Sequence, residues 1–171
     1  IDIFWTGEKV CSRSFDRENI EFIAEQFRRL PTLWDNYPVN DGEKGSRFLN
    51  LQPFTKRPGW LEQYTAGHFA NPMNQPFLSL LPLATLASSY GASPEQQEEN
   101  WKRAAEQLCP EFVARIWQDA DVFQQAGLDG IDLNNWRKQF SHYLSSESVY
   151  AKEICAWLEG EYIFDPDCLT G

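Results

Sequence analysis

The segment TLWDNYPVND, from Thr32 to Asp41, has an unusually high density of side chains that can bind a polar ligand. It contains two amides, two carboxylates and an indole: Asn36, Asn40, Asp35, Asp41 and Trp34. Amides and carboxylates form directional hydrogen bonds, and an aromatic ring offers an apolar surface, so together they suit a ligand with hydroxyl groups on an apolar ring. A surface turn needs only one or two Asn or Asp residues to satisfy its own backbone. The segment therefore indicates a binding site, with turn chemistry as the alternative.

The composition is that of a folded, acidic protein. The chain has 171 residues, of which 42% are hydrophobic and 23% charged, close to the average for soluble globular proteins. It has 15 Lys and Arg against 25 Asp and Glu, which gives a formal net charge of −10. Because nucleic acids and anionic membranes bind basic surfaces, this balance argues against both as partners. The sequence also has no apolar run of about 20 residues that would span a membrane.

Cysteine and histidine are too scattered to predict a metal site. The sequence has two histidines, and four cysteines without a CxxC motif: His68, His142, Cys11, Cys109, Cys155 and Cys168. We expect no metal and no cofactor. We also expect free, buried thiols rather than disulfides, because a chain of this size does not need disulfides to fold.

The first residues of the chain bear on whether it is part of a longer polypeptide. It starts without Met at Ile-Asp-Ile-Phe-Trp, which is typical of a strand already under way. No signal peptide opens the sequence, and no N-x-S/T sequon occurs in it. We therefore expect a piece of a longer polypeptide, located in the cytoplasm.

Strand and helix patterns alternate over the first 91 residues. Strands are predicted at 1–5, 33–34 and 47–51, the last being RFLNL. Between the first two, Asp16 is a candidate N-cap for a helix with apolar residues at 20, 23, 27 and 30, which Pro31 ends. Strand, helix, strand is the unit of a parallel sheet, and the loops after such strands carry ligand chemistry. The loops TGEKV and WDNYPVND occupy that position.

The rest of the sequence predicts helices. The apolar stretch 77–90 is typical of a buried helix, kinked at Pro82 and closed by Gly91. Four amphipathic helices follow: one capped by Ser93, one over 111–126, one opened by Asp132 and one over 147–162. Short loops between them indicate a helical bundle. The sequence thus predicts an α/β part over residues 1–91 and an all-α bundle over residues 92–171.

Four motifs in register resemble a known family. FWTGEKV, LWDNYPVND, RFLNLQPFTKR and ANPMNQPFLSLLPLATLA, in this order and spacing, resemble glycoside hydrolase family 84, the O-GlcNAcases and related β-N-acetylglucosaminidases. The resemblance is specific from Ile3 to about Ala87 and weaker from Ser93 to Tyr162. It implies that residues 1–91 are the C-terminal part of a (β/α)8 TIM-type barrel, followed by the family's helical domain. It also implies a substrate bearing N-acetylglucosamine on a glycoprotein or glycan, cleaved through an oxazoline formed by the sugar's own acetamide.

The resemblance assigns roles to six residues. It implies that Asp41 accepts hydrogen bonds from sugar hydroxyls, that Asn71 adds a polar contact, and that Asn36 lies near the acetamide. It places Trp34 in the wall of the acetamide pocket, with Thr6 and Val10 lining it. Turn chemistry stays an alternative for Thr6, core packing for Trp34, and hydrogen bonds within the loop for Asp35 and Asn40, and we expect His68 to belong to loop structure.

The catalytic residues of the family are missing from this sequence. Family 84 uses two adjacent aspartates, and no Asp-Asp pair occurs here. We therefore expect the pair, and the rest of the barrel, to lie elsewhere in the parent chain or in a second chain, and the fragment alone to be inactive. The alternative is a non-catalytic interaction protein in which the bundle does the work and the barrel segment is a remnant.

Overall fold

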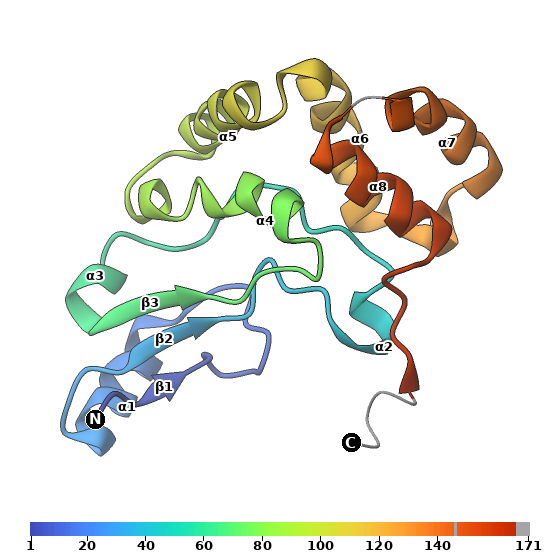
Figure 1. The fold of residues 1–171 in the computed structure, drawn as a ribbon. Coiled ribbons are helices and arrows are strands. Elements are labelled where there is room, and N and C mark those ends of the chain that lie inside the picture. The colour runs from blue at the N-terminus through green and yellow to red at the C-terminus, as the bar shows by residue number, and fades with distance from the viewer. Residues whose placement is uncertain (146, 167–171) are drawn as a thin grey trace.

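The computed structural model describes residues 1–145 and 147–166, and it contains a three-stranded parallel sheet at one end (Figure 1). The strands are β1 (Phe4–Trp5), β2 (Thr32–Asp35) and β3 (Gly67–Ala70), in the order β1-β2-β3. In this register Leu33 of β2 lies between Trp5 and His68. The predicted parallel arrangement of the first two strands is confirmed.

One face of the sheet is covered by helices α1 (Arg17–Phe27) and α3 (Leu61–Tyr64). A small core forms there around four buried residues: Phe15, Ile20, Leu33 and Leu61. As predicted, Asp16 caps α1, because its carboxylate accepts a hydrogen bond of 3.2 Å from the Asn19 amide. The helix ends at Phe27, before Pro31, because Arg28 adopts a left-handed conformation with φ of 52°.

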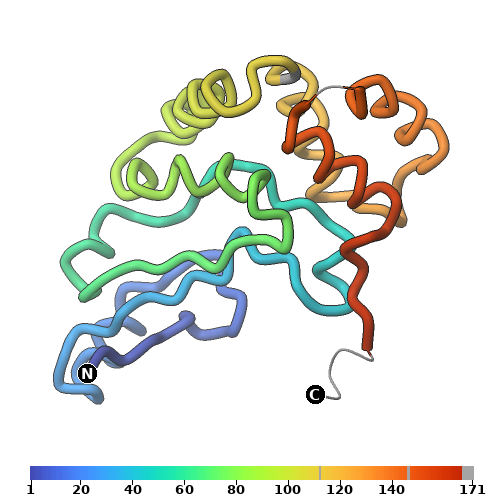
Figure 2. Tube along the Cα trace, viewed as in Figure 1, coloured from blue at the N-terminus to red at the C-terminus, as the bar shows by residue number. Residues whose placement is uncertain are grey.

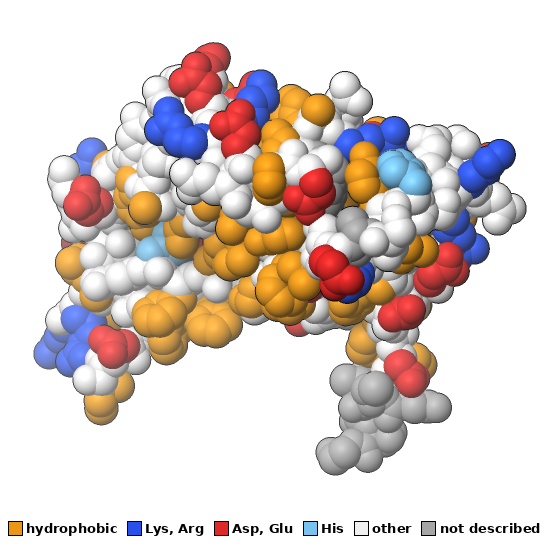
Figure 3. All heavy atoms as spheres, turned by 45° about the horizontal axis from the view of Figure 1, so that its top comes forward, with side chains coloured by type: hydrophobic (Ala, Val, Ile, Leu, Met, Phe, Trp, Pro, Cys, Tyr) orange, Lys and Arg blue, Asp and Glu red, His pale blue; other side chains and the backbone are white. Residues whose placement is uncertain are grey.

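The other face of the sheet is open and aromatic. Phe4 of β1 and Phe69 of β3 are 51% and 54% exposed, and the half-buried Trp34 of β2 lies on the same face. The Phe4 ring centroid is 5.5 Å from that of Trp34 and 5.6 Å from that of Phe69. Hydrophobic side chains gather over the sheet in the space-filling view (Figure 3).

The prediction of a strand at RFLNL is wrong. After the short helix α2 (Gly42–Gly45), residues 46–60 have no regular secondary structure. Leu49 and Leu51 are fully buried, and their backbone groups bond to residues of later helices instead of to a strand. The Leu49 N–H donates to Phe123 O at 3.3 Å, and Leu51 O accepts from Trp101 Nε1 at 2.6 Å. The third strand, GHFA, was predicted as loop because it has little apolar pattern, and its pairing with β2 defines it.

The predicted helix over 77–90 is divided in two. Helix α4 (Pro76–Leu83) ends one residue after Pro82, and a 3₁₀ turn, η1 (Ala87–Tyr90), follows. Pro82 lies inside α4, where it has no N–H to donate to the carbonyl four residues earlier, and the predicted single kinked helix over 77–90 is wrong.

The four predicted helices after residue 92 are present. They are α5 (Pro94–Leu108), α6 (Val113–Gln125), α7 (Leu133–Phe140) and α8 (Val149–Glu159), with short 3₁₀ turns η2 (Pro110–Phe112), η3 (Leu128–Gly130) and η4 (Ser141–Ser145) between them. Ser93 and Asp132 cap α5 and α7 through their side-chain oxygens, as predicted. Gly127 follows α6 and Gly160 follows α8, both with positive φ.

The main hydrophobic core joins segments from both sides of residue 92. It contains Leu51 and Leu81 together with Trp101, Phe123 and Trp157 from the later helices. Figure 2 shows the chain before residue 60 running beside those helices. The division of the chain into two domains near Gly91 stays a prediction.

Candidate functional site

Four of the six predicted site residues meet at the carboxyl edge of the sheet. Asn36 follows β2 directly, and its Oδ1 accepts hydrogen bonds of 3.0 Å from Trp34 Nε1 and 3.0 Å from Asn71 Nδ2. Its Nδ2 donates to the Val10 carbonyl at 2.6 Å. Asn71 follows β3, and its backbone amide donates to Asp35 O at 2.9 Å. The loops after all three strands therefore converge on one side-chain amide.

The cluster leaves hydrogen-bonding capacity for a ligand. Within the described residues, Asn71 Oδ1 has no hydrogen-bond partner, so a buried sugar hydroxyl or amide can donate to it. Asn36, by contrast, uses its oxygen and one N–H inside the cluster. Val10 contributes its backbone carbonyl, while its side chain is 74% exposed.

Asp41 and Thr6 are not bonded to this cluster. Asp41 precedes α2, is exposed, and does not cap that helix with its side chain. Its carboxylate has no hydrogen-bond partner among residues 1–145 and 147–166, so it is free to accept from a ligand. Thr6, half-buried at the end of β1, also makes no side-chain hydrogen bond in the described part of the chain.

A buried ionic network that the sequence patterns did not reveal lies beneath the cluster. The Asp35 carboxylate, 1% exposed, receives two hydrogen bonds from Arg57: Nη2 to Oδ1 at 2.6 Å and Nε to Oδ2 at 2.7 Å. His68 Nε2 lies 3.0 Å from Asp35 Oδ2, and His68 Nδ1 bonds to the Tyr90 hydroxyl. Burial, followed by the Asp35 charge, raises the pKa of Tyr90 to about 12. The protonated Tyr90 hydroxyl can donate to His68 Nδ1, and His68 Nε2 faces the Asp35 carboxylate.

This network changes two expectations. His68 lies in β3 and not in a loop, and Asp35 bonds to residues outside its own loop. Arg57 also donates to Arg13 O at 3.1 Å and to Thr55 O at 2.7 Å. It therefore ties the loop after β1, the end of β2 and the 52–57 segment to one buried guanidinium.

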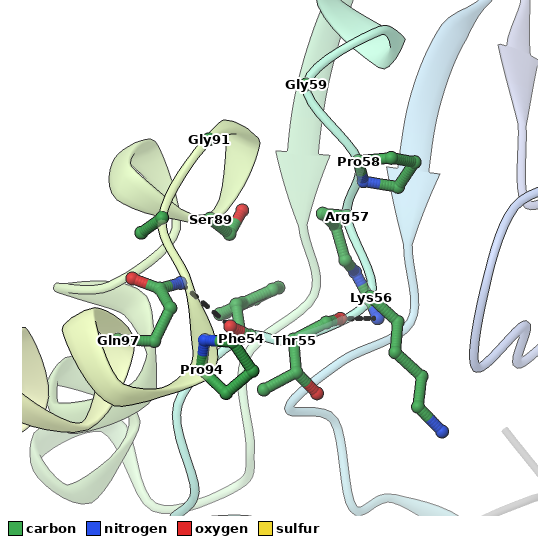
Figure 4. Close-up of a pocket in the computed structure, with 11 residues that line it drawn as sticks. Phe54, Thr55, Lys56, Arg57, Pro58, Gly59, Ser89, Gly91, Pro94 and Gln97 are labelled. Atoms are coloured by element: carbon green, nitrogen blue, oxygen red, sulfur yellow. Dashed lines mark hydrogen bonds between the residues drawn. The ribbon is translucent and has the colours of Figure 1, made fainter.

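A polar cleft of about 370 Å³ adjoins the cluster. Asn36 is the one predicted site residue in its lining, which is rich in amides and includes Asn50, Gln52 and Gln124. A second cleft, of about 360 Å³, lies between the Phe54–Gly59 segment and residues 89–97 (Figure 4). No predicted site residue lines the second cleft.

The described residues contain no cluster of three His, Cys, Asp or Glu side chains that could hold a metal ion. Cys109 and Cys155 are buried and free, as predicted, and burial raises the pKa of the Cys109 thiol to about 12. Cys11 is exposed, and Cys168 lies outside the described residues. No helix in the part that the structure describes is long and apolar enough to cross a membrane.

Comparison with known proteins identifies the family. The model of the β-N-acetylglucosaminidase family matches residues 1–120 of the chain. The chain belongs to the β-N-acetylglucosaminidase family. The resemblance to glycoside hydrolase family 84 is thereby confirmed.

Two curated relatives of this chain are the Protein O-GlcNAcases of Rattus norvegicus and Mus musculus. Each is 32% identical to it over 90 residues, which are 53% of this chain and 10% of the relative. The chain therefore spans about a tenth of the length of these relatives.

Two solved structures resemble the fold of this family member. A mutant O-GlcNAc hydrolase of Thermobaculum terrenum matches with a TM-score of 0.65 and 31% identity, over 94% of this chain and 35% of that one. CpGH84B matches with a TM-score of 0.63 and 18% identity, over 93% of this chain and 34% of that one. The second likeness concerns the fold alone.

Proposed function

We propose that this chain is the sugar-holding part of a glycoside hydrolase that removes terminal β-linked N-acetylglucosamine. In this proposal residues 1–91 form the C-terminal part of a (β/α)8 barrel, and residues 92–171 form the helical domain that follows it. Family membership and the likeness to an O-GlcNAc hydrolase support the assignment. The sheet supports it too, because its strands are parallel, one face is covered by helices, and the other is open and aromatic, as an inward face of a barrel fragment would be.

The observation that carries the proposal is the cluster of Trp34, Asn36 and Asn71 at the carboxyl edge of the sheet. Ligands of parallel sheets bind at that edge. The Trp34 ring supplies an apolar wall, Asn71 a free carbonyl oxygen, and Asp41 a free carboxylate that can accept from two hydroxyls. A terminal sugar with an acetamide group uses all three. Thr6 and Val10 would line the same pocket from the loop after β1.

The proposed chemistry divides the work between this chain and the rest of the enzyme. The 2-acetamido oxygen of the sugar attacks its own anomeric carbon and expels the leaving group, forming an oxazoline that water then opens. Two adjacent aspartates would orient the acetamide and exchange protons with the leaving group and the water. Both aspartates would lie outside this chain, which has no Asp-Asp pair, so residues 1–171 alone would bind sugar without hydrolysing it.

A second candidate is a non-catalytic interaction protein. The missing Asp-Asp pair favours it, as does a groove of about 430 Å³ along α7, η4 and α8, whose lining includes Phe140, Leu144 and Cys155. A full-length protein that binds no N-acetylglucosamine analogue and releases no sugar would support this candidate over the glycosidase.

Asp41→Ala in the full-length protein tests the proposed site. The variant should raise KM for an aryl β-N-acetylglucosaminide by roughly tenfold or more, because two sugar hydroxyls lose a charged acceptor. Glu43→Ala is a matched control, since Glu43 is another exposed carboxylate two residues along. Equal KM values for the two variants would refute the assignment of Asp41.

A further inference from the structure

The side chain of Asn40, next to Asp41, makes three hydrogen bonds, as many as that of Asn36 in the same loop. Asn40 is 2% exposed. Its Nδ2 donates to the Phe48 carbonyl at 2.9 Å and to Gln75 Oε1 at 2.8 Å, while its Oδ1 accepts from the Asn74 amide at 2.9 Å. The expectation that Asn40 bonds within its own loop is therefore wrong.

These three hydrogen bonds connect segments that carry different parts of the proposed site. Asn74 and Gln75 belong to the loop after β3, which begins with Asn71. Phe48 follows α2, the short helix that Asp41 precedes. Among the described residues, the Asp41 side chain makes no hydrogen bond or ion pair that would fix its position.

We propose that Asn40 is a positioning residue that holds Asp41 in register with Asn71. This inference rests on the proposed function. The loops after β2 and β3 are already joined at their base by the bond from Asn71 N to Asp35 O. Asn40, five residues after Asp35, joins the loops after β2 and β3 a second time. The two loops are therefore connected at two points, and Asp41 directly follows the second.

The side chain of Gln75 indicates that this connection between the two loops reduces the stability of the fold. It is fully buried, and its Nε2 has no hydrogen-bond partner among the described residues. The hydrogen bonds of Asn40 determine the orientation of the Gln75 amide. Because the Asn74 N–H donates to Asn40 Oδ1, Asn40 Nδ2 faces Gln75, and Gln75 must accept with its oxygen, Oε1. A buried donor without a partner is destabilising. A buried donor without a partner is expected where function, rather than stability, determines the arrangement of side chains.

The test compares three variants of the full-length protein by KM, kcat and melting temperature. Asn40→Ala removes all three hydrogen bonds. Asn40→Asp keeps the acceptor for Asn74 N and offers a carboxylate to the unpaired Gln75 Nε2 after rotation of that amide, but it loses the donor to the Phe48 carbonyl. Gln97→Ala is the matched control, because Gln97 is also 2% exposed and its Nε2 donates to two backbone carbonyls, Phe54 O at 2.8 Å and Thr85 O at 3.1 Å, away from the site loops (Figure 4).

A positioning role predicts a change in binding beyond the change in stability. Asn40→Ala should raise KM about tenfold with kcat within about threefold, because the sugar contacts act equally in the ground and transition states. Gln97→Ala should lower the melting temperature with KM within about twofold, and Asn40→Asp should recover part of the KM loss. A KM for Asn40→Ala equal to that of Gln97→Ala would overturn the inference.

Two further outcomes separate this inference from the proposed function. If Asp41→Ala leaves KM unchanged, the sugar site itself is refuted. If Asp41→Ala raises KM but Asn40→Ala does not, only the positioning role fails. Should Asn40→Ala not fold, Asn40→Asp decides, because it still loses the donor to Phe48 O: a partly raised KM supports the role, and a KM no higher than that of Gln97→Ala overturns it.

Discussion

At the scale of single residues, the site loop depends on groups that never touch the ligand. Asp35 and Arg57 form a nearly fully buried pair with two hydrogen bonds, and removing one member leaves the other charge without its partner. Asp35→Ala should therefore lower the free energy of unfolding of the full-length protein by roughly 3–5 kcal/mol, measured by urea denaturation.

A surface pair provides the comparison for this prediction. Arg17 and Glu21 are four residues apart on α1 and lie 2.9 Å apart, but both side chains are largely exposed. Glu21→Ala should change the unfolding midpoint only slightly, because exposed ion pairs are screened by water. Similar losses for the two variants would show that burial of the Asp35 pair is not what stabilises this loop.

The sequence singled out a candidate segment but did not reveal which of its residues bond within the structure. The density of Asn and Asp in Thr32–Asp41 marked it as a site, and the family resemblance separated Asp41 and Asn36 from the rest. Asp35 could not be assigned, because its partners Arg57 and His68 lie 22 and 33 residues away in the sequence. Asn40 has the same property, with partners up to 35 residues away.

At the scale of elements, α8 holds the beginning of α4. The Glu153 carboxylate accepts from Phe77 N at 3.1 Å and Leu78 N at 2.8 Å, two amides of the first turn that have no partner within their own helix. Burial raises the pKa of this carboxyl from its ordinary value of 4.5, although the two amides act in the opposite direction. The folded state therefore binds a proton more readily here than the unfolded chain does.

This shift predicts a pH dependence of stability with a definite sign. The contribution of Glu153 is fully present below pH 4.5 and is lost as pH rises through the raised pKa. In Glu153→Gln this titration is absent, so urea midpoints should show the wild type losing stability relative to the variant between pH 4.5 and neutrality. Glu99→Gln, an exposed glutamate on α5, controls for the substitution. A wild type that gains stability relative to Glu153→Gln as pH rises would contradict the prediction.

The beginnings of three helices and the first two strands were predictable from sequence, whereas the third strand was not. Asp16, Ser93 and Asp132 each cap a helix through local hydrogen bonds, which depend on neighbouring residues alone. RFLNL has a strand-like composition, but α5 and α6 bond to its backbone. GHFA has little strand pattern and is a strand because β2 lies beside it. Tertiary contacts decided both cases.

At the scale of the whole molecule, the later helices support the loops of the sheet. Trp101 of α5 donates to Leu51 O, Gln124 of α6 accepts from Gln52 N at 3.0 Å, and Trp157 of α8 donates to Ser46 O at 3.3 Å. The residues they contact belong to the irregular 46–60 segment, to which Asn40 is bonded through Phe48. The helical region thus stabilises the proposed site indirectly, through the segment beneath it.

The open sheet face leads to opposite predictions for residues 1–171 alone and for a protein with the complete proposed barrel. Phe4 and Phe69 are exposed in residues 1–171, and in the proposed barrel they would face its interior. Residues 1–171 expressed alone should self-associate through this face, and Phe4→Lys with Phe69→Lys should reduce the association seen by sedimentation.

In the full-length protein the same double variant should instead lower the melting temperature strongly, because it would bury two charges. Phe22→Lys on α1, where Phe22 is 56% exposed, should do neither. A full-length double variant as stable as Phe22→Lys would mean that no barrel closes over this face.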